Sequence, residues 1–213
     1  MDTINATQVF FSIVITSYNR ASYLPRALDS LLAQTEKDWE AIIVNDGSTD
    51  HTDTVILPYL QHKNIHYIKQ NNQGCVGAKN KGIQFSTGKY ISFLDSDDEY
   101  KTDHLAIRKS ILLANPKIDL LHGGVQILGS HYVPDMHQPG QLIDLKDCAI
   151  GGTFFINHSL AHQLNGFHKI EMGHDADFLL RAELANFIIK KIDHPTYIYH
   201  RELEDSMTNK LRQ

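Results

Sequence analysis

The chain has 213 residues, of which 42% are hydrophobic and 21% charged, which is ordinary for one globular domain, with or without a small appendage. The formal net charge of −5 disfavours a nucleic-acid-binding protein, whose surface is usually basic, but allows a local site for an anionic ligand. Cys75 and Cys148 lack metal-site spacing, no apolar run approaches the roughly 20 residues that cross a bilayer, and the N-terminus lacks a signal-peptide layout. We therefore expect a soluble, cytoplasmic protein with reduced thiols; attachment to the inner face of the membrane stays open.

The first half of the chain alternates predicted strands with predicted helices. Residues 9–16 form a continuous apolar and β-branched run, which is typical of a strand buried on both faces. Residues 22–34 carry an apolar stripe at helical spacing after a capping serine, and this pattern predicts a helix. Further strands are predicted at residues 39–44, 65–68 and 90–94, and further helices at residues 52–61, 76–86 and 103–114.

The second half of the chain is less regular. We expect a strand at residues 120–128, a long loop or hairpin at 133–144, a glycine-containing strand at 149–156, a helix at 175–185, and strands at 187–192 and 197–200. The polar tail from residue 202 is expected to be mobile. The alternation of apolar strands with helices indicates an α/β fold in one domain, with a mainly parallel central sheet flanked by helices.

Four polar clusters lie beside these predicted elements, at residues 16–19 (TSYN), 45–48 (NDGS), 74–77 (GCVG) and 95–98 (DSDD). Three of them follow strands and one precedes a helix. In parallel sheets, ligands bind in a crevice at the carboxyl ends of the strands. The clusters together therefore predict one ligand-binding crevice.

Each cluster also has a plain structural explanation. Asp46 could only shape a turn, and the acidic residues 95–98 could only cap a helix and face solvent. However, three carboxylates within four positions repel one another, and a hard cation such as Mg²⁺ or Mn²⁺ would remove that repulsion. The loop before residue 76 leads into a helix N-terminus, where free N–H groups and Lys79 favour an anion.

An ordered set of motifs resembles the family 2 glycosyltransferases. The motifs are residues 11–20 (FSIVITSYNR), 44–50 (VNDGSTD), 77–82 (GAKNKG) and 88–98 (GKYISFLDSDD). They cover roughly the first half of the chain, and the second half matches more loosely. The resemblance implies a GT-A type fold in a single domain spanning 1–213. It implies a nucleotide-sugar-binding half at about 9–98, an acceptor-binding and catalytic half at 99–201, and a tail at 202–213.

The resemblance also implies roles for single residues near the nucleotide. Thr16, Tyr18 and Asp46 match positions that hold the nucleoside, with Asp46 facing the base, usually uracil. Lys79 matches a position near the nucleotide that is usually arginine, and this departure changes a planar fork into a point charge. Asp95 matches the residue near the ribose.

For the metal and the chemistry, the resemblance implies Asp97 as the carboxylate that binds Mn²⁺ or Mg²⁺ on the diphosphate, within the Asp-x-Asp motif. His200 lies where related enzymes often place a histidine near the metal or the acceptor, and a purely structural histidine is the alternative. Asp175 matches the general base, where the family typically has Glu-Asp in place of His174 and Asp175. Asp177 competes with it, and both acids could merely favour a helix N-terminus.

The implied activity is transfer of a sugar, with inversion, from a nucleoside-diphosphate sugar, usually UDP-linked, to a hydroxyl group. The acceptor would be a saccharide or a lipid-linked saccharide, in polysaccharide or glycan synthesis. The alternative is a catalytically inactive nucleotide-sugar-binding or assembly subunit. A phosphotransferase is disfavoured because its Asp-x-Asp motif generally follows the first strand. The sugar, the acceptor, the linkage and the oligomeric state are not encoded in recognisable motifs.

Overall fold

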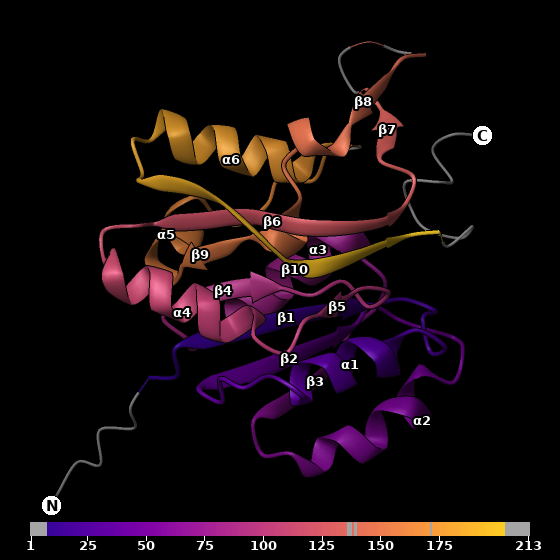
Figure 1. The fold of residues 1–213 in the computed structure, drawn as a ribbon. Coiled ribbons are helices and arrows are strands. Elements are labelled where there is room, and N and C mark those ends of the chain that lie inside the picture. Colours follow the sequence, from indigo (N-terminus) through magenta and orange to yellow (C-terminus); the bar gives the residue numbers. More distant parts are fainter. Residues whose placement is uncertain (1–7, 136–137, 139, 171, 203–213) are drawn as a thin grey trace, which may run out of the picture.

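The computed structural model describes residues 8–135, 138, 140–170 and 172–202. Its centre is an eight-stranded sheet in the order β3-β2-β1-β4-β9-β6-β10-β5 (Figure 1). The strands of this sheet are β1 (Phe11–Ser17), β2 (Trp39–Asn45), β3 (Ile65–Lys69), β4 (Tyr90–Phe93), β5 (Glu99–Tyr100), β6 (Leu120–Gly129), β9 (Phe155–Asn157) and β10 (Ile189–Arg201). Strands β3, β2, β1 and β4 pair parallel in that order, and β6 pairs parallel with β10. Strand β9 lies antiparallel between β4 and β6, and β5 pairs antiparallel with β10. The predicted α/β fold with a mainly parallel sheet is therefore confirmed.

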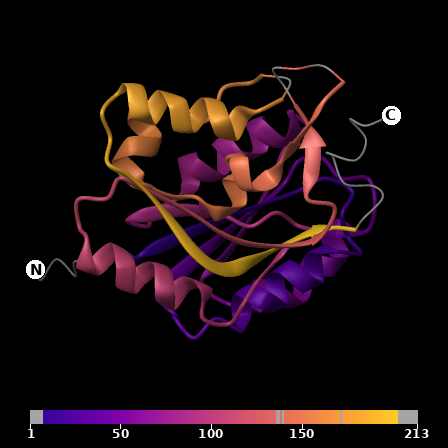
Figure 2. The ribbon, with the colours of Figure 1, turned by 45° about the horizontal axis from the view of Figure 1, so that its top comes forward.

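Helices cover both faces of this sheet. The α-helices are α1 (Leu24–Leu32), α2 (Thr52–Ile56), α3 (Gly74–Phe85), α4 (His104–Ala114), α5 (His158–Gln163) and α6 (His174–Leu184). Figure 2 shows α3, α5 and α6 on one face, with α1 and α4 on the other. A short antiparallel hairpin of β7 (Tyr132–Pro134) and β8 (Leu142–Asp144) projects beyond the end of β6, as the hairpin alternative predicted.

The two faces have separate apolar cores because alternate side chains of a strand point to opposite sides. In β1, Ile13 and Ile15 pack with α1, whereas Val14 packs with α3. The central strands are thus buried on both faces, which explains their uninterrupted apolar sequences.

Three local predictions were wrong. Residues 52–61 are not one helix: α2 ends at Ile56 and a 3-10 helix, Leu57–Gln61, follows, because Pro58 has no N–H for the helical hydrogen bond. Residues 149–156 are not one strand, since Gly151–Thr153 form a 3-10 turn closed by Thr153, whose hydroxyl donates to the Ile150 carbonyl, before β9 begins. A further 3-10 turn is Leu145–Asp147.

The third correction concerns the C-terminal strands. The predicted strands at 187–192 and 197–200 are one strand, β10, whose register against β6 shifts between Ile192 and Tyr197. Pro195 lies in that irregular stretch and interrupts the sequence pattern, but β6 pairs with β10 on both sides of it. The tail beyond Glu202 lies outside the described residues.

No described helix is both long enough and apolar enough to cross a membrane.

Candidate functional site

A cavity of about 530 Å³ lies where the polar clusters meet. Its lining combines residues from the ends of β1 and β2, the first turns of α3, the turn after β4 and the start of α6. The predicted site residues in this lining are Thr16, Tyr18, Asp46, Lys79, Asp95, Asp97 and Asp175. The four polar clusters for which the sequence predicted one crevice therefore meet at this cavity, and Asp175 also lines it, whereas His200 does not.

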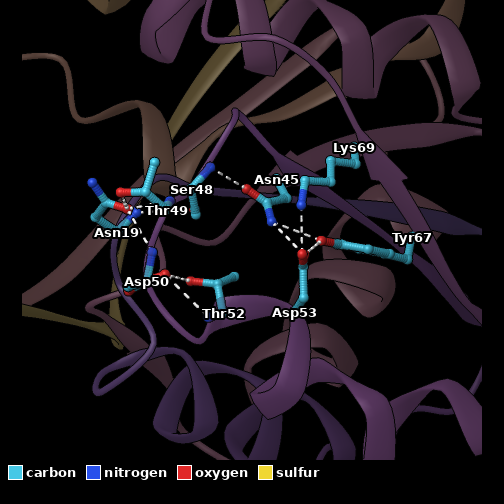
Figure 3. A network of polar contacts seen from close by, with 9 residues as sticks. All are labelled: Asn19, Asn45, Ser48, Thr49, Asp50, Thr52, Asp53, Tyr67 and Lys69. Carbon is cyan, nitrogen blue, oxygen red and sulfur yellow. Dashed lines mark hydrogen bonds and ion pairs between the residues drawn. The ribbon is translucent and has the colours of Figure 1, made fainter.

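The loop between β2 and α2 is held in place by Asn19 at the end of β1 (Figure 3). The Asn19 side-chain oxygen accepts hydrogen bonds from the backbone N–H groups of Thr49, at 2.8 Å, and Asp50, at 3.4 Å. The Asn19 backbone N–H donates to the Ser48 hydroxyl at 3.0 Å. Asn19 adopts a left-handed backbone (φ 53°), which asparagine tolerates better than most residues. These contacts fix the loop that carries Asp46.

The same loop is held on its other side by Asn45. As Figure 3 shows, the Asn45 amide donates to Asp53, at 2.8 Å, and to the Tyr67 hydroxyl, at 2.7 Å. The Asn45 side-chain oxygen accepts from the Ser48 N–H at 2.8 Å. Lys69 pairs with Asp53 at 2.5 Å and completes this outer network.

Asp46 joins two loops and does not merely shape its own turn. Its Oδ1 accepts from the Gln70 side chain at 2.7 Å and from the Gln73 N–H at 2.9 Å. Its Oδ2 accepts from the Gly74 N–H at 2.9 Å, at the start of α3. Three neutral donors thus hold a buried carboxylate at the cavity wall.

The three carboxylates after β4 divide into two environments. Asp95 and Asp97 line the cavity, whereas Asp98 is buried below it. Asp98 accepts hydrogen bonds from the Tyr197 hydroxyl, at 2.6 Å, and from the His200 backbone N–H, at 2.8 Å. Burial, with Asp95 and Asp97 nearby, raises the pKa of Asp98 well above its usual range. Asp98 therefore fastens β10 to the acidic turn, a role that the sequence pattern did not separate from that of its neighbours.

The surroundings of Asp97 favour a bound cation. Burial, followed by repulsion from Asp95, raises the pKa of Asp97. Arg20 Nε lies 4.0 Å from its carboxylate, and Arg26 donates to its backbone carbonyl, which holds the turn against α1. In the described part of the chain no group of three His, Cys, Asp or Glu side chains could hold a metal. Asp97 beside Asp95 thus fits Mg²⁺ or Mn²⁺ only as a partial ligand set, with water or phosphate oxygens completing it.

His200 lies apart from the cavity lining. Its Nε2 is 2.9 Å from a Glu99 carboxylate oxygen, and its Nδ1 is 2.5 Å from a Glu202 carboxylate oxygen. The ring is buried between these two acids. Metal ligation by His200 stays a prediction, and it would require one of the two contacts to break.

Asp175 lies in the first turn of α6 and faces Lys79. Its Oδ2 accepts from the Gly151 N–H at 3.0 Å. Its Oδ1 lies 3.7 Å from Lys79 Nζ and 3.2 Å from His174 Nε2, the latter without hydrogen-bond geometry. Asp177 points elsewhere: it pairs with Arg181, one helical turn further along, at 2.8 Å. Of the two competing acids, Asp175 is the one in the cavity lining.

Gly151 makes a contact with Asp175 that the sequence pattern did not predict. A β-carbon there would lie 2.3 Å from a carboxylate oxygen of Asp175, so only glycine fits this contact. The available signal was the Gly-Gly pair at 151–152, a pattern that suits either the lining of an acceptor pocket or a strand with close backbone packing.

The sequence is similar to those of known glycosyltransferases. The profile described as Glycosyl transferase family 2 matches residues 12–121, just over half of the chain. A Rickettsia prowazekii protein named uncharacterized glycosyltransferase RP339 is 37% identical over 159 residues, which are 71% of this chain and 47% of that protein. The Escherichia coli protein named UDP-Glc:alpha-D-GlcNAc-diphosphoundecaprenol beta-1,3-glucosyltransferase WfgD is 29% identical over 144 residues, 66% of this chain and 56% of that protein. The chain spans about half the length, or less, of such curated relatives.

Solved structures show the same fold at low sequence identity. S. aureus TarS 1–349 in complex with UDP-GlcNAc superposes with a TM-score of 0.78 at 20% identity, over 94% of this chain and 60% of that chain. The mannosyltransferase PcManGT from Pyrobaculum calidifontis, in complex with GDP-Man and Mn²⁺, superposes with a TM-score of 0.74 at 16% identity, over 95% of this chain and 59% of that chain. The expected GT-A type fold is thus confirmed.

Proposed function

The chain belongs to glycosyl transferase family 2, and on that basis we propose that it transfers a sugar from a nucleoside-diphosphate sugar to a hydroxyl group of an acceptor. The observation that carries this proposal is the single cavity in which residues suited to bind a nucleoside, a cation-bound diphosphate and a reacting hydroxyl meet. These residues come from separate segments of the chain, so their meeting is a property of the fold.

For the donor, Thr16, Tyr18 and Asp46 would hold the nucleoside and Asp95 the ribose. Asp46 suits a base that presents an N–H, because its fixed carboxylate is an acceptor only. UDP is the favoured nucleotide, since the E. coli relative is named for UDP-Glc and the TarS complex contains UDP-GlcNAc. Lys79 would lie near the nucleotide, as the sequence predicts, but buried behind Asp95 and without a direct contact to it.

Asp97 would hold the divalent cation together with oxygens of the diphosphate. When bound, that cation supplies charge neutralisation for the leaving diphosphate. The Mn²⁺ in the mannosyltransferase complex supports a metal in this fold.

Asp175 would act as the general base. It would take the proton of the acceptor hydroxyl while the hydroxyl oxygen bonds to the anomeric carbon and the bond to the diphosphate breaks. The bonding electrons leave with the diphosphate. This single displacement inverts the anomeric carbon and forms no covalent enzyme intermediate.

For the acceptor we propose a saccharide, either free or lipid-linked, in glycan or polysaccharide synthesis. The name of the E. coli relative, which specifies a diphosphoundecaprenol-linked sugar, supports the lipid-linked form. A lipid-linked acceptor would place the protein at the cytoplasmic face of a membrane. Residues 9–98 would serve the donor and residues 99–201 the acceptor and the base.

Calorimetric titration of UDP and GDP, each with and without Mn²⁺, tests the proposal. We expect Mn²⁺-dependent binding of UDP that is lost in Asp97→Ala and retained in Asp193→Ala, a matched exposed acid outside the cavity lining. Absence of binding to either nucleotide in any metal condition would overturn the proposal. Release of UDP from UDP-glucose or UDP-N-acetylglucosamine then separates an active enzyme from a subunit that only binds the donor.

A further inference from the structure

The ammonium group of Lys79 lies in a closed setting between two carboxylates. Lys79 is 3% exposed, and its Nζ is 3.7 Å from an Asp175 oxygen and 4.0 Å from an Asp95 oxygen. Both separations are longer than a hydrogen bond. Asp95 belongs to the acidic turn after β4 and Asp175 to the first turn of α6, so Lys79 reaches both parts of the cavity.

Two aromatic rings confine the ammonium group laterally. The Phe93 and Phe167 ring centroids are each 5.6 Å from Lys79 Nζ, within the range of cation–π attraction. Because burial of a charge is costly without such compensation, the surroundings hold the amine at this point and do not allow it to swing into solvent.

The backbone at and before Phe167 is itself held by side chains of two helices. The Asn80 amide donates to the Phe167 carbonyl and its oxygen accepts from the Phe167 N–H, both at 2.8 Å. Arg181 donates to the carbonyls of Leu164 and Gly166 at 2.8 and 2.9 Å. The wall beside Lys79 is therefore built from α3 and α6 together.

The neighbouring carboxylates favour the charged form of the Lys79 amine. Burial lowers the pKa of the Lys79 amine, but the carboxylates of Asp175 and then Asp95 outweigh burial and raise it. Burial also lowers the pKa of His174 more than Asp175 raises it, which disfavours the charged form of that ring. Lys79 thus supplies the positive charge beside Asp175.

We propose that Lys79 is a positioning residue for Asp175, which it ties to the donor side of the cavity through Asp95. The Gly151 N–H holds Oδ2 of Asp175, and the Lys79 ammonium group faces the buried Oδ1 at 3.7 Å, so the two contacts together fix the direction of the carboxylate. This role rests on the proposed function, because it takes Asp175 as the base. It goes beyond the nucleotide contact predicted from the sequence, since it links the nucleotide half to the acceptor half.

If Lys79 positions the base, its replacement should lower the rate of turnover and leave donor binding unchanged. A residue that only contacts the nucleotide changes donor affinity, whereas a residue that orients the base changes the chemical step. We expect Lys79→Met to lower kcat about 100-fold, while KM and the affinity for UDP change by no more than about twofold. Lys79→Arg restores the charge and should recover kcat to within about tenfold of the wild type. Lys81→Met is the matched control, because Lys81 lies on the same helix but packs over Phe85.

The kinetic measurement uses release of UDP from UDP-glucose and from UDP-N-acetylglucosamine. A second measurement needs no turnover: the Lys79 ammonium signal in ¹⁵N-lysine-labelled protein, identified by its absence in Lys79→Met. We expect its hydrogen exchange to become faster by about tenfold or more in Asp175→Asn, which removes the partner charge, and to stay unchanged in Lys81→Met.

The outcomes are distinct. Loss of UDP affinity in Lys79→Met with unchanged kcat, or hydrogen exchange that is the same in Asp175→Asn, overturns the positioning role and leaves the proposed function standing. A wild-type chain that binds no nucleoside diphosphate and releases no UDP overturns the proposed function and, with it, the role of Lys79. A fall in kcat with unchanged UDP affinity, rescued by arginine, supports both.

Discussion

Asp46 and Asp175 are two carboxylates of one cavity that are held by different forces. Asp46 accepts three hydrogen bonds of 2.7–2.9 Å from neutral donors. Asp175 accepts one, from Gly151, and otherwise faces Lys79 at 3.7 Å and the His174 ring at 3.2 Å, the latter without hydrogen-bond geometry. The region around Asp46 is therefore fixed by directional contacts, whereas the region around Asp175 depends on charge and on close packing. Changes near Asp175 should affect turnover, and changes near Asp46 should affect donor binding.

The largest expected effect is at Asp175 itself. Asp175→Asn keeps the shape of the side chain but removes the basic oxygen, so we expect kcat to fall by about 10³-fold. The affinity for UDP, measured by calorimetry, should stay within about twofold. Asp177→Asn is the control, because that acid pairs with Arg181 away from the cavity. Equal losses in both variants would contradict the assignment of the base.

The next effect is expected at Gly151. Gly151→Ala places a carbon 2.3 Å from the present position of an Asp175 oxygen, so the carboxylate must shift. A displacement of about 1 Å can lower kcat about 100-fold, which steady-state release of UDP would measure. Unchanged kcat in Gly151→Ala would show that Asp175 is not held as we infer.

A smaller effect, on UDP affinity and not on kcat, is expected at Asn19. Asn19→Gly removes the side chain that fixes the Asp46 loop, and glycine accepts the left-handed backbone at this position. We expect UDP affinity to fall about tenfold, because the loop must then be ordered on binding. The value of kcat at saturating donor should change little. A fall in kcat larger than the fall in affinity would erase the distinction between the two regions.

The smallest effect concerns the pH dependence of folding stability through His122, whose ring packs against Phe154, next to the turn Gly151–Thr153. His122 in β6 packs against Phe154, and burial, then Lys191, lowers its pKa to about 4. Its ordinary value is 6.5, so the unfolded chain binds a proton first as pH falls. The stability contributed by neutral His122 is complete above pH 6.5 and is lost as pH falls toward 4.

Between pH 7 and pH 5 this loss should be on the order of 1 kcal/mol. Thermal denaturation across that range measures it, and His122→Gln should reduce the slope. An identical slope in the variant would assign the acid sensitivity to other groups, such as the buried His104, whose pKa burial also lowers.

The sequence alone indicated a parallel sheet between helices and the polar clusters that meet at the cavity. Continuous apolar runs such as residues 11–15 require burial on both faces, which a parallel sheet between helices provides. Polar residues that follow such strands then meet at one edge of the sheet, and Asp46, Asp95 and Asp97 do so. These inferences succeed because they depend on local pattern and on the geometry that all parallel sheets share.

Only the tertiary structure decided which side chains touch within the cavity. Lys79 meets Asp175, Gly151 holds the same carboxylate, and Asp98 turns away to bind Tyr197, each across a long stretch of chain. Pattern along the sequence carries no such information. Asp95, Asp97 and Asp98 look alike in the sequence, and only packing buries Asp98 and leaves the other two at the cavity. Burial and distance, which set the cost of each charge, exist only once the chain has folded.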